Sequence, residues 1–179
     1  TNGLTPEHLA SFWKSLATEF KSFDNIYAYG LMNEPHDLDS CTTWFEMAQL
    51  CIDSIRTVDM DTRIMVGGNH WSSAERWVEL SDTLKYLKDP ADKLAFGAHV
   101  YFDADTSGTY KRGYDEDSCY LEKGIDRVRP FVEWLKANKF EGMVGEYGIP
   151  DSDSRWNLVL DKFLSYLQEN DINGCYWAA

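Results

Sequence analysis

Short apolar segments alternate along the chain with longer segments whose apolar residues recur every three or four positions. Successive side chains of a strand point to opposite faces of a sheet, so a short segment that is apolar throughout predicts a strand covered on both faces. Five segments have this pattern: 26–32, 63–67, 94–100, 142–145 and 174–177. They predict the strands of a parallel sheet.

The segments around these strands predict amphipathic helices. The first helix begins at Pro6, because Thr5 is a favoured capping residue and proline suits the first helical turn. Its apolar face comprises Leu9, Phe12, Trp13, Leu16 and Phe20. Four further helices are predicted at about 41–57, 74–80, 121–139 and 154–170. This alternation of helices and strands indicates an α/β protein with a parallel sheet.

No repeat, low-complexity tract or linker divides the 179 residues, which therefore predict one structural unit. One long irregular segment, 102–120, follows the third strand and is rich in Asp, Gly, Ser and Thr. Loops of this length inside a compact domain are usually functional or mobile. The acidic groups at 103–105 and 115–117 lack the ligand spacing of a calcium loop, so we expect a solvated acidic loop.

The composition excludes several classes of protein. The chain has 17 Lys and Arg against 30 Asp and Glu, a formal net charge of −13, whereas nucleic-acid binding requires clustered positive charge. The sequence contains no run of about 18 apolar residues, so no membrane span is predicted. Thr1 is not followed by the basic start and apolar region of a signal peptide. The 7 Trp, 10 Tyr and 9 Phe exceed the needs of a core of this size. This surplus predicts a stacking site for a planar or sugar ligand.

Other familiar chemistries find no support in the sequence. The chain has four cysteines, Cys41, Cys51, Cys119 and Cys175. They lack the spacing of a zinc site, and their even number permits two disulfides without requiring them. No Gly-x-Ser-x-Gly element provides a serine nucleophile, and the Gly-Gly pair before Asn69 lacks the further glycines of a phosphate-binding loop. No metal ion or organic cofactor is implied.

Polar and ionisable residues follow the apolar part of each predicted strand. The carboxyl ends of parallel strands meet at one edge of a sheet or barrel, where the active sites of α/β proteins are built. Glu34 and Glu146 are the acids that directly end apolar strands. Two facing carboxyl groups can divide into a protonated acid and an ionised nucleophile, as glycoside hydrolysis requires. The spacing alone also allows a second interpretation, in which backbone and loop donors simply satisfy both acids.

Three sequence elements, YGLMNEPHD, GAHVYFD and GEYGIP, occur in this order at strand ends. Together they resemble glycoside hydrolase family 5, the retaining β-glycanases that fold as a (β/α)8 barrel. The resemblance implies that residues 1–179 form a partial catalytic domain, a partial (β/α)8 TIM barrel covering about strands 4 to 8. The first strands, which supply an Arg and a His in the family, and the last helix would be lacking. Because five strands do not close such a barrel, a missing barrel segment or a second copy is expected to complete it.

The resemblance assigns chemical roles to the two glutamates. Glu34 would be the acid/base that protonates the leaving glycosidic oxygen and then activates water, and Glu146 would be the nucleophile. For a retaining mechanism the two carboxyl groups lie about 5 to 5.5 Å apart. Tyr101 would hydrogen-bond to Glu146, and His99 would orient the site beside it.

Several further residues are candidates for contact with the sugar. The resemblance implies that Asn33 holds the sugar 2-hydroxyl and that Trp177 stacks on the ring at the cleavage subsite. Three other strand-end residues either contact the ligand or serve loop hydrogen bonding and packing: His36, His70 and Trp71. The tryptophans of the predicted helices are expected to pack in the core: Trp13, Trp44, Trp77, Trp134 and Trp156.

The resulting hypothesis is a retaining endo-β-1,4-glucanase that hydrolyses cellulose or mixed-linkage β-glucan. A secreted, extracellular protein is expected from the resemblance, because a polymeric substrate cannot enter the cell. One alternative is a non-catalytic carbohydrate-binding or self-assembling barrel fragment. Another is a β-mannanase on the same scaffold, a choice that subsite loops such as 102–120 would decide.

Overall fold

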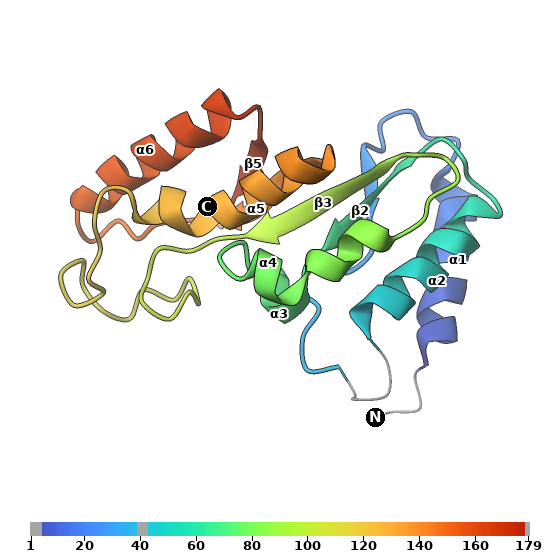
Figure 1. Ribbon diagram of the computed structural model, residues 1–179, viewed down its shortest axis with the longest axis horizontal. Coiled ribbons are helices and arrows are strands. Elements are labelled where there is room, and N and C mark those ends of the chain that lie inside the picture. Colours follow the sequence, from blue (N-terminus) through green and yellow to red (C-terminus); the bar gives the residue numbers. More distant parts are fainter. Residues whose placement is uncertain (1–4, 39–42, 178–179) are drawn as a thin grey trace.

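The computed structural model describes residues 5–38 and 43–177. Five strands form one parallel sheet in which each strand pairs with the next along the chain. The strands are β1 (Ala28–Gly30), β2 (Arg63–Gly67), β3 (Leu94–His99), β4 (Glu141–Tyr147) and β5 (Asn173–Tyr176). The predicted α/β class with a parallel sheet is confirmed. Because the strand order follows the sequence, all carboxyl ends lie at one edge of the sheet (Figure 1).

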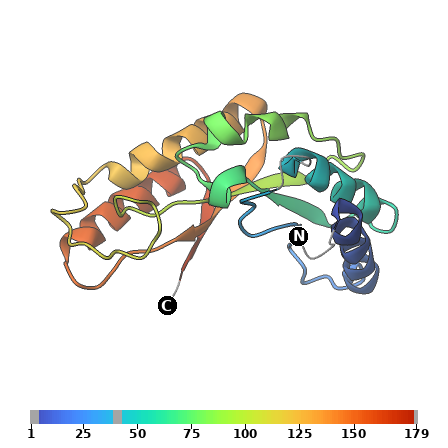
Figure 2. The same cartoon turned by 90° about the horizontal axis from the view of Figure 1, so that it is seen from below.

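The helices cover one side of this sheet. They are α1 (Pro6–Phe20), α2 (Trp44–Arg56), α3 (Asn69–Ser72), α4 (Trp77–Leu80), α5 (Lys123–Asn138) and α6 (Arg155–Glu169), together with a 3₁₀ helix, η1 (Asp82–Tyr86). Figure 2 shows the helices as an arch with the strands beneath it. A sheet that curves in one direction beneath such an arch has the form of a barrel wall.

Three predicted boundaries are wrong for identifiable reasons. The first strand was expected over 26–32, but the backbone N–H of Ile26 closes a turn onto Phe23, and the strand spans only Ala28–Gly30. The predicted helix 74–80 is reduced to α4, because the N–H of Ala74 donates to His99 of β3. Helix α2 starts after Thr43, whose side chain accepts a hydrogen bond from the N–H of Glu46.

Three predicted strands also have different ends. The third was expected over 94–100 and ends one residue earlier, at His99. The fourth was expected over 142–145 and is longer, because Glu141–Tyr147 pairs with strands on both sides. The fifth was expected over 174–177 and spans Asn173–Tyr176, which leaves Trp177 just beyond the strand.

The helix tryptophans pack as predicted. Trp44, Trp77 and Trp156 are fully buried, and Trp134 is nearly so. Trp13 is half-buried, and its indole nitrogen donates to the carbonyl of Leu31. Aromatic rings meet edge to face in the layer between β3 and α5, as ring quadrupoles favour. The surplus of aromatic residues seen in the composition is therefore used mainly in the core.

The two edges of the sheet have unpaired outer sides within the described residues. Strand β1 has only three residues, and Phe23 and Tyr27 before it are exposed. Strand β5 is exposed at all of its positions. Open edges of parallel sheets seldom remain uncovered in soluble proteins, because their backbone groups need partners.

Two further findings concern the state of the cysteines and the length of the helices. Cys51, Cys119 and Cys175 are free thiols, and Cys41 lies outside the described residues. Burial raises the pKa of the Cys51 thiol to about 12, so this group stays protonated at neutral pH. No helix in the described part of the chain has both the length and the apolar character of a membrane span.

Candidate active site

The residues predicted to carry the chemistry meet at the carboxyl edge of the sheet. The Nδ1 atom of His99, at the end of β3, lies 2.7 Å from Oε1 of Glu34 and 3.5 Å from Oε2 of Glu146. Glu34 follows β1, and Glu146 lies near the end of β4. Side chains more than a hundred residues apart in sequence thus share one small volume.

Glu146 is held by two further donors. The hydroxyl of Tyr101 donates to Oε2 of Glu146 at 2.8 Å, and the side-chain amide of Asn33 donates to Oε1 at 3.2 Å. Both hydrogen bonds hold the carboxylate of Glu146 in one orientation. Burial, followed by the hydrogen bond to Glu146, raises the pKa of the Tyr101 hydroxyl well above its usual range, so this group remains a donor. The predicted contact between Tyr101 and Glu146 is confirmed.

An irregularity in strand pairing turns Glu146 towards the other site residues. Position 142 of β4 faces Leu135 of α5, and strict alternation would send Glu146 to that same side. The register shifts after Ala98, so that His99 pairs with Glu146. The ring of Tyr147 then packs on Phe163 of α6. This bulge re-aims the carboxylate, a common use of bulges beside active sites.

Gly145 occupies the bulge for a steric reason. A Cβ atom at this position would lie 3.1 Å from Nε2 of His99. A larger residue would therefore press on the imidazole ring that contacts both carboxylates. The absence of a side chain at Gly145 keeps space for His99 in the site.

A left-handed turn follows β2 and carries two of the predicted binding residues. His70, Trp71 and Ser72 have φ angles of 54°, 56° and 54°, which is strained for residues other than glycine. The turn is anchored because the Ser72 hydroxyl donates to the carbonyl of Asn33 and the N–H of Trp71 donates to that of Pro35. Strain held in this way is typical of functional segments.

The turn presents Trp71 to a cavity beside Glu34. Trp71 is 41% exposed, and the ring of His36 stacks on it with a centroid distance of 4.6 Å and an interplanar angle of 14°. His70 meets the same indole edge-on and contacts Arg76 through Nε2. His70 and Trp71 therefore line the cavity, whereas His36 supports Trp71 and does not line it.

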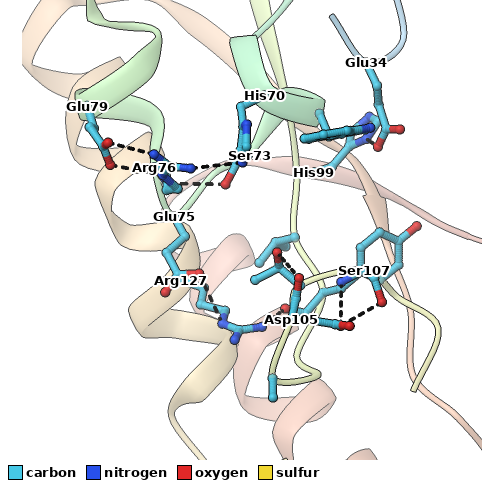
Figure 3. A pocket seen from close by; sticks show the side chains of 15 residues that line it. Glu34, His70, Ser73, Glu75, Arg76, Glu79, His99, Asp105, Ser107 and Arg127 are labelled. Atoms are coloured by element: carbon cyan, nitrogen blue, oxygen red, sulfur yellow. Dashed lines mark hydrogen bonds and ion pairs between the residues drawn. The ribbon is translucent and has the colours of Figure 1, made fainter. Parts of the chain in front are cut away.

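The cavity has a volume of about 820 Å³ and lies on the Glu34 side of the pair of glutamates. Figure 3 shows charged side chains around it that sequence reasoning missed: Glu75, Arg76, Glu79 and Arg127. Arg76 pairs with Glu79, and Arg127 approaches Glu75. Arg127 left a signal in the sequence, because it is a cation that shares one helix face with several apolar residues and with Lys123.

Trp177 lies on the other side of the site. Its N–H donates to the carbonyl of Tyr147 at 2.8 Å, which fixes it at the end of β5 beside β4. The side chain is 61% exposed and does not line the cavity next to Glu34. Two exposed indoles, Trp71 after β2 and Trp177 after β5, thus lie at the same edge of the sheet as the two glutamates.

The expectation of a solvated acidic loop is wrong for two of its residues. Asp103 and Asp117 are buried, whereas Asp105, Asp115 and Glu116 are exposed as expected. The carboxylate of Asp103 is surrounded by donors of its own loop, which offset the cost of burying it. Its role is therefore structural in the first place.

One group of side chains has the donor set of a metal site. Glu34, His99 and Glu146 each offer one ligand atom, and these atoms all lie within 4.8 Å of one another. Imidazole and carboxylate ligands suit divalent transition metals. In the structure, His99 Nδ1 hydrogen-bonds to Glu34 and the Tyr101 hydroxyl hydrogen-bonds to Glu146.

Residues 3–179 match the family model described as cellulase (glycosyl hydrolase family 5). The chain belongs to this family. A probable endo-beta-1,4-glucanase B of Neosartorya fischeri is 36% identical over 174 residues, which are 94% of this chain and 50% of that protein. The corresponding protein of Aspergillus oryzae is 34% identical over 98% of this chain and 51% of its own length. The chain thus spans about half the length of these family 5 relatives.

Solved family 5 structures show the same fold. The endoglucanase Cel5A of Pseudomonas stutzeri superposes with a TM-score of 0.91 at 38% identity, covering 99% of this chain and 55% of that one. XacCel5A, solved in complex with cellopentaose, gives a TM-score of 0.86 at 32% identity and covers 57% of that chain. The five strands and their helices are therefore part of a (β/α)8 barrel, as the sequence elements implied.

Proposed function

We propose that this chain supplies the two catalytic carboxyl groups of a retaining endo-β-1,4-glucanase. The observation that carries the proposal is the cluster at the ends of β1, β3 and β4, where atoms of Glu34, His99 and Glu146 lie within 4.8 Å of one another. Inverting enzymes need carboxyl groups about 6.5 to 9.5 Å apart, so that water fits between the sugar and the base. Single oxygen atoms of the two groups at 4.8 Å or less are closer to the separation of about 5 to 5.5 Å that retaining enzymes use, which supports retention.

Glu146 is the proposed nucleophile. Its carboxylate accepts hydrogen bonds from Tyr101 and Asn33, and these donors fix its orientation towards the site. In the first step it attacks the anomeric carbon, the bond to the leaving oxygen breaks, and a covalent glycosyl-enzyme forms. As a sugar binds, the amide of Asn33 is also close enough to the nucleophile to reach the neighbouring 2-hydroxyl.

Glu34 is the proposed acid/base. Its side chain is 30% exposed, compared with 14% for Glu146, and it faces the cavity that would hold the leaving part of the glucan. Glu34 donates its proton to the departing oxygen and in the second step removes a proton from the attacking water. His99 holds Oε1 of Glu34 in place throughout.

The proposed substrate is a β-1,4-linked glucan, either cellulose or a mixed-linkage β-glucan. The relatives named endo-beta-1,4-glucanase support this class over mannan. Solved relatives were obtained with cellobiose and cellopentaose. Trp71 and Trp177 offer exposed indole faces at the same edge of the sheet as the glutamates, and sugar rings stack their apolar faces on such surfaces.

A further barrel segment or a second copy is proposed to complete the fold. The support is the open outer edge of β1, next to exposed Phe23 and Tyr27, and the exposed strand β5 at the other edge. Eight strands are needed to close a barrel of this type. Because a glucan polymer cannot enter a cell, we also propose that the protein acts outside it.

Hydrolysis of cellopentaose by the full-length protein, followed by proton NMR of the first products, tests the proposal. The β-anomer should form first, because two inversions restore the starting configuration. Glu146→Gln and Glu34→Gln should each lower kcat by at least about a thousandfold. Glu141→Gln is the matched control, since this glutamate lies at the opposite end of β4 in an ion pair with Arg63. An α-anomeric first product, or wild-type turnover in Glu146→Gln, would overturn the proposal.

The non-catalytic alternative is tested with the 179-residue chain itself. Incubation with cellopentaose, with binding measured by calorimetry and products by chromatography, separates the two functions. Binding without any product would mean that this chain needs the rest of the barrel for catalysis. Products that disappear in Glu146→Gln would instead show that the chain is catalytic alone.

A further inference from the structure

The loop after β3 folds back on itself around one buried carboxylate. Asp103 is only 2% exposed. It accepts hydrogen bonds from the Ser107 hydroxyl at 3.0 Å, from the N–H of Gly108 at 3.1 Å and from the N–H of Tyr110 at 3.2 Å. All three donors lie within seven residues of the acid in sequence. Asp103 therefore fixes the course of residues 103–110.

This course brings the backbone of Gly108 against the ring of Tyr101. Gly108 has a φ angle of +70°, and a Cβ atom at this position would lie 2.7 Å from two ring carbons of Tyr101. Only glycine satisfies both the left-handed backbone and the close approach. The loop thus forms a wall on which the Tyr101 ring rests.

The backbone of Tyr101 is held by helix α5. The guanidinium of Arg127, which is buried, donates to the backbone carbonyl of Tyr101 and at 2.7 Å to that of Asp103. Figure 3 shows Arg127 and the loop residues Asp105 and Ser107 along one side of the cavity. The backbone of Tyr101 is fixed by Arg127, and its ring is fixed by Gly108.

The same ring donates its hydroxyl to Glu146 at 2.8 Å. We propose that Asp103 and Gly108 are positioning residues that hold Tyr101 in hydrogen-bonding contact with the nucleophile. This inference rests on the proposed role of Glu146. Neither residue touches the reacting atoms; both act through the place of the Tyr101 ring. A ring displaced by a fraction of an ångström loses its alignment to a carboxylate that itself cannot move far.

Kinetics of four variants in the full-length protein provide the first test. Gly108→Ala should lower kcat on cellopentaose about tenfold to a hundredfold with little change in KM. Gly113→Ala is the matched control, because it lies in the same loop and an added Cβ would meet only Glu116 Oε2 at 3.8 Å. Adding Gly108→Ala to Tyr101→Phe should cost little more than Tyr101→Phe alone, since both remove one contact. Fully additive losses, or equal effects of the two alanine variants, would overturn the inference.

A second readout does not depend on catalysis. In protein labelled with ¹³Cζ-tyrosine, the Tyr101 signal is assigned by its loss in Tyr101→Phe. Gly108→Ala should shift this signal, and Gly113→Ala should leave it in place. An unshifted signal in Gly108→Ala would contradict the inference. If the wild-type protein proves inactive, the proposed function fails, whereas this NMR comparison still decides whether Gly108 positions Tyr101.

Asp103→Asn is a milder variant for the case in which Gly108→Ala does not fold. An asparagine keeps one acceptor oxygen and replaces the other by a donor, which would face the N–H groups of the loop. The Tyr101 signal should shift and kcat should fall, although less than in Gly108→Ala. Thermal unfolding of the variant confirms that it is folded, and a folded Asp103→Asn protein with the wild-type Tyr101 signal and kcat would overturn the inference.

Discussion

The Nδ1 atom of His99 lies 2.7 Å from Oε1 of Glu34. His99 is almost fully buried, whereas Glu34 reaches into the cavity. The imidazole, which lines the same cavity, fixes the direction of the carboxyl group proposed as the acid/base. A contact of this length between an acid and a ring nitrogen orients the proton as well as the heavy atoms.

Replacing this imidazole should reduce turnover more than binding. His99→Asn removes the contact with Glu34 while keeping a polar side chain, so kcat on cellopentaose should fall about tenfold to a hundredfold. Steady-state kinetics of the full-length protein measure the effect. His8→Asn on α1 is the control, because His8 is exposed and bonds only to Thr5 nearby. An unchanged kcat in His99→Asn would show that Glu34 needs no such orientation.

Removing the indole of Trp71 should weaken binding on the Glu34 side of the site. Trp71→Ala is expected to raise KM for cellopentaose about threefold to tenfold, in line with the loss of one aromatic stack. His36→Ala should have a smaller effect in the same direction, because His36 stacks on Trp71 without lining the cavity. The control is Val78→Ala, an exposed position on α4. A larger effect of His36→Ala than of Trp71→Ala would mean that the histidine itself binds sugar.

A buried ion pair outside the site should dominate stability. The side chains of Arg56 and Asp89 are 3% and 2% exposed and form two parallel hydrogen bonds at 2.7 and 2.9 Å. Arg56→Leu leaves the buried carboxylate of Asp89 without its cation and should lower the free energy of unfolding by about 3 to 5 kcal/mol. Denaturant unfolding measures this loss.

Two further variants test whether the unpaired buried charge causes that loss of stability. Adding Asp89→Leu to Arg56→Leu should recover much of the stability, since the double variant leaves no unpaired charge. Lys162→Leu, which removes a surface pair with Glu122, should change the free energy of unfolding by less than about 1 kcal/mol. If the double variant were no more stable than Arg56→Leu, the unpaired charge would not be the cause.

Asp59 should make stability depend on pH in the acid range. Burial alone would raise the pKa of this carboxyl group, but hydrogen bonds from Thr62, Asp61 and Tyr29 outweigh it and lower the pKa to about 2. A lowered folded-state pKa stabilises the fold above the ordinary value near 4, and this contribution, about 2 to 3 kcal/mol, is lost as the pH falls towards 2.

Comparison of wild type with Asp59→Asn isolates this effect. The variant should be less stable at pH 7, and the difference should shrink between about pH 4 and pH 2. Urea unfolding over this pH range measures it. Asp161→Asn on the exposed face of α6 is the control and should follow the wild-type profile. A difference that is constant with pH would assign the loss to packing instead of charge.

The sequence was sufficient to predict a parallel α/β sheet and the meeting of Glu34 with Glu146 at its carboxyl edge. Both follow from alternation and from the common edge of parallel strands, which are properties of local pattern. The contact between Tyr101 and Glu146 was also predictable, although from family resemblance and not from spacing.

Features that depend on backbone geometry were not predictable. The bulge at Gly145 reverses the side to which Glu146 points, and period-two reasoning has no means of locating it. The left-handed turn at 70–72 uses residues that seldom adopt positive φ, so propensity argued for a helix nearby. Asp103 was expected in water because its neighbours are polar, whereas donors within its own loop make burial favourable.

Because every strand pairs with its successor, the proposed catalytic residues can be transferred between proteins as one segment. Asn33, Glu34, His99, Tyr101 and Glu146 all lie on one uninterrupted stretch of polypeptide, with no strand from another part of the chain inserted between them. A single crossover before α1 would exchange the entire set between two barrels and would replace strand pairings only at the outer edges of β1 and β5. Recombination of related genes could therefore combine one enzyme's acid, nucleophile and leaving-group cavity with another enzyme's remaining wall.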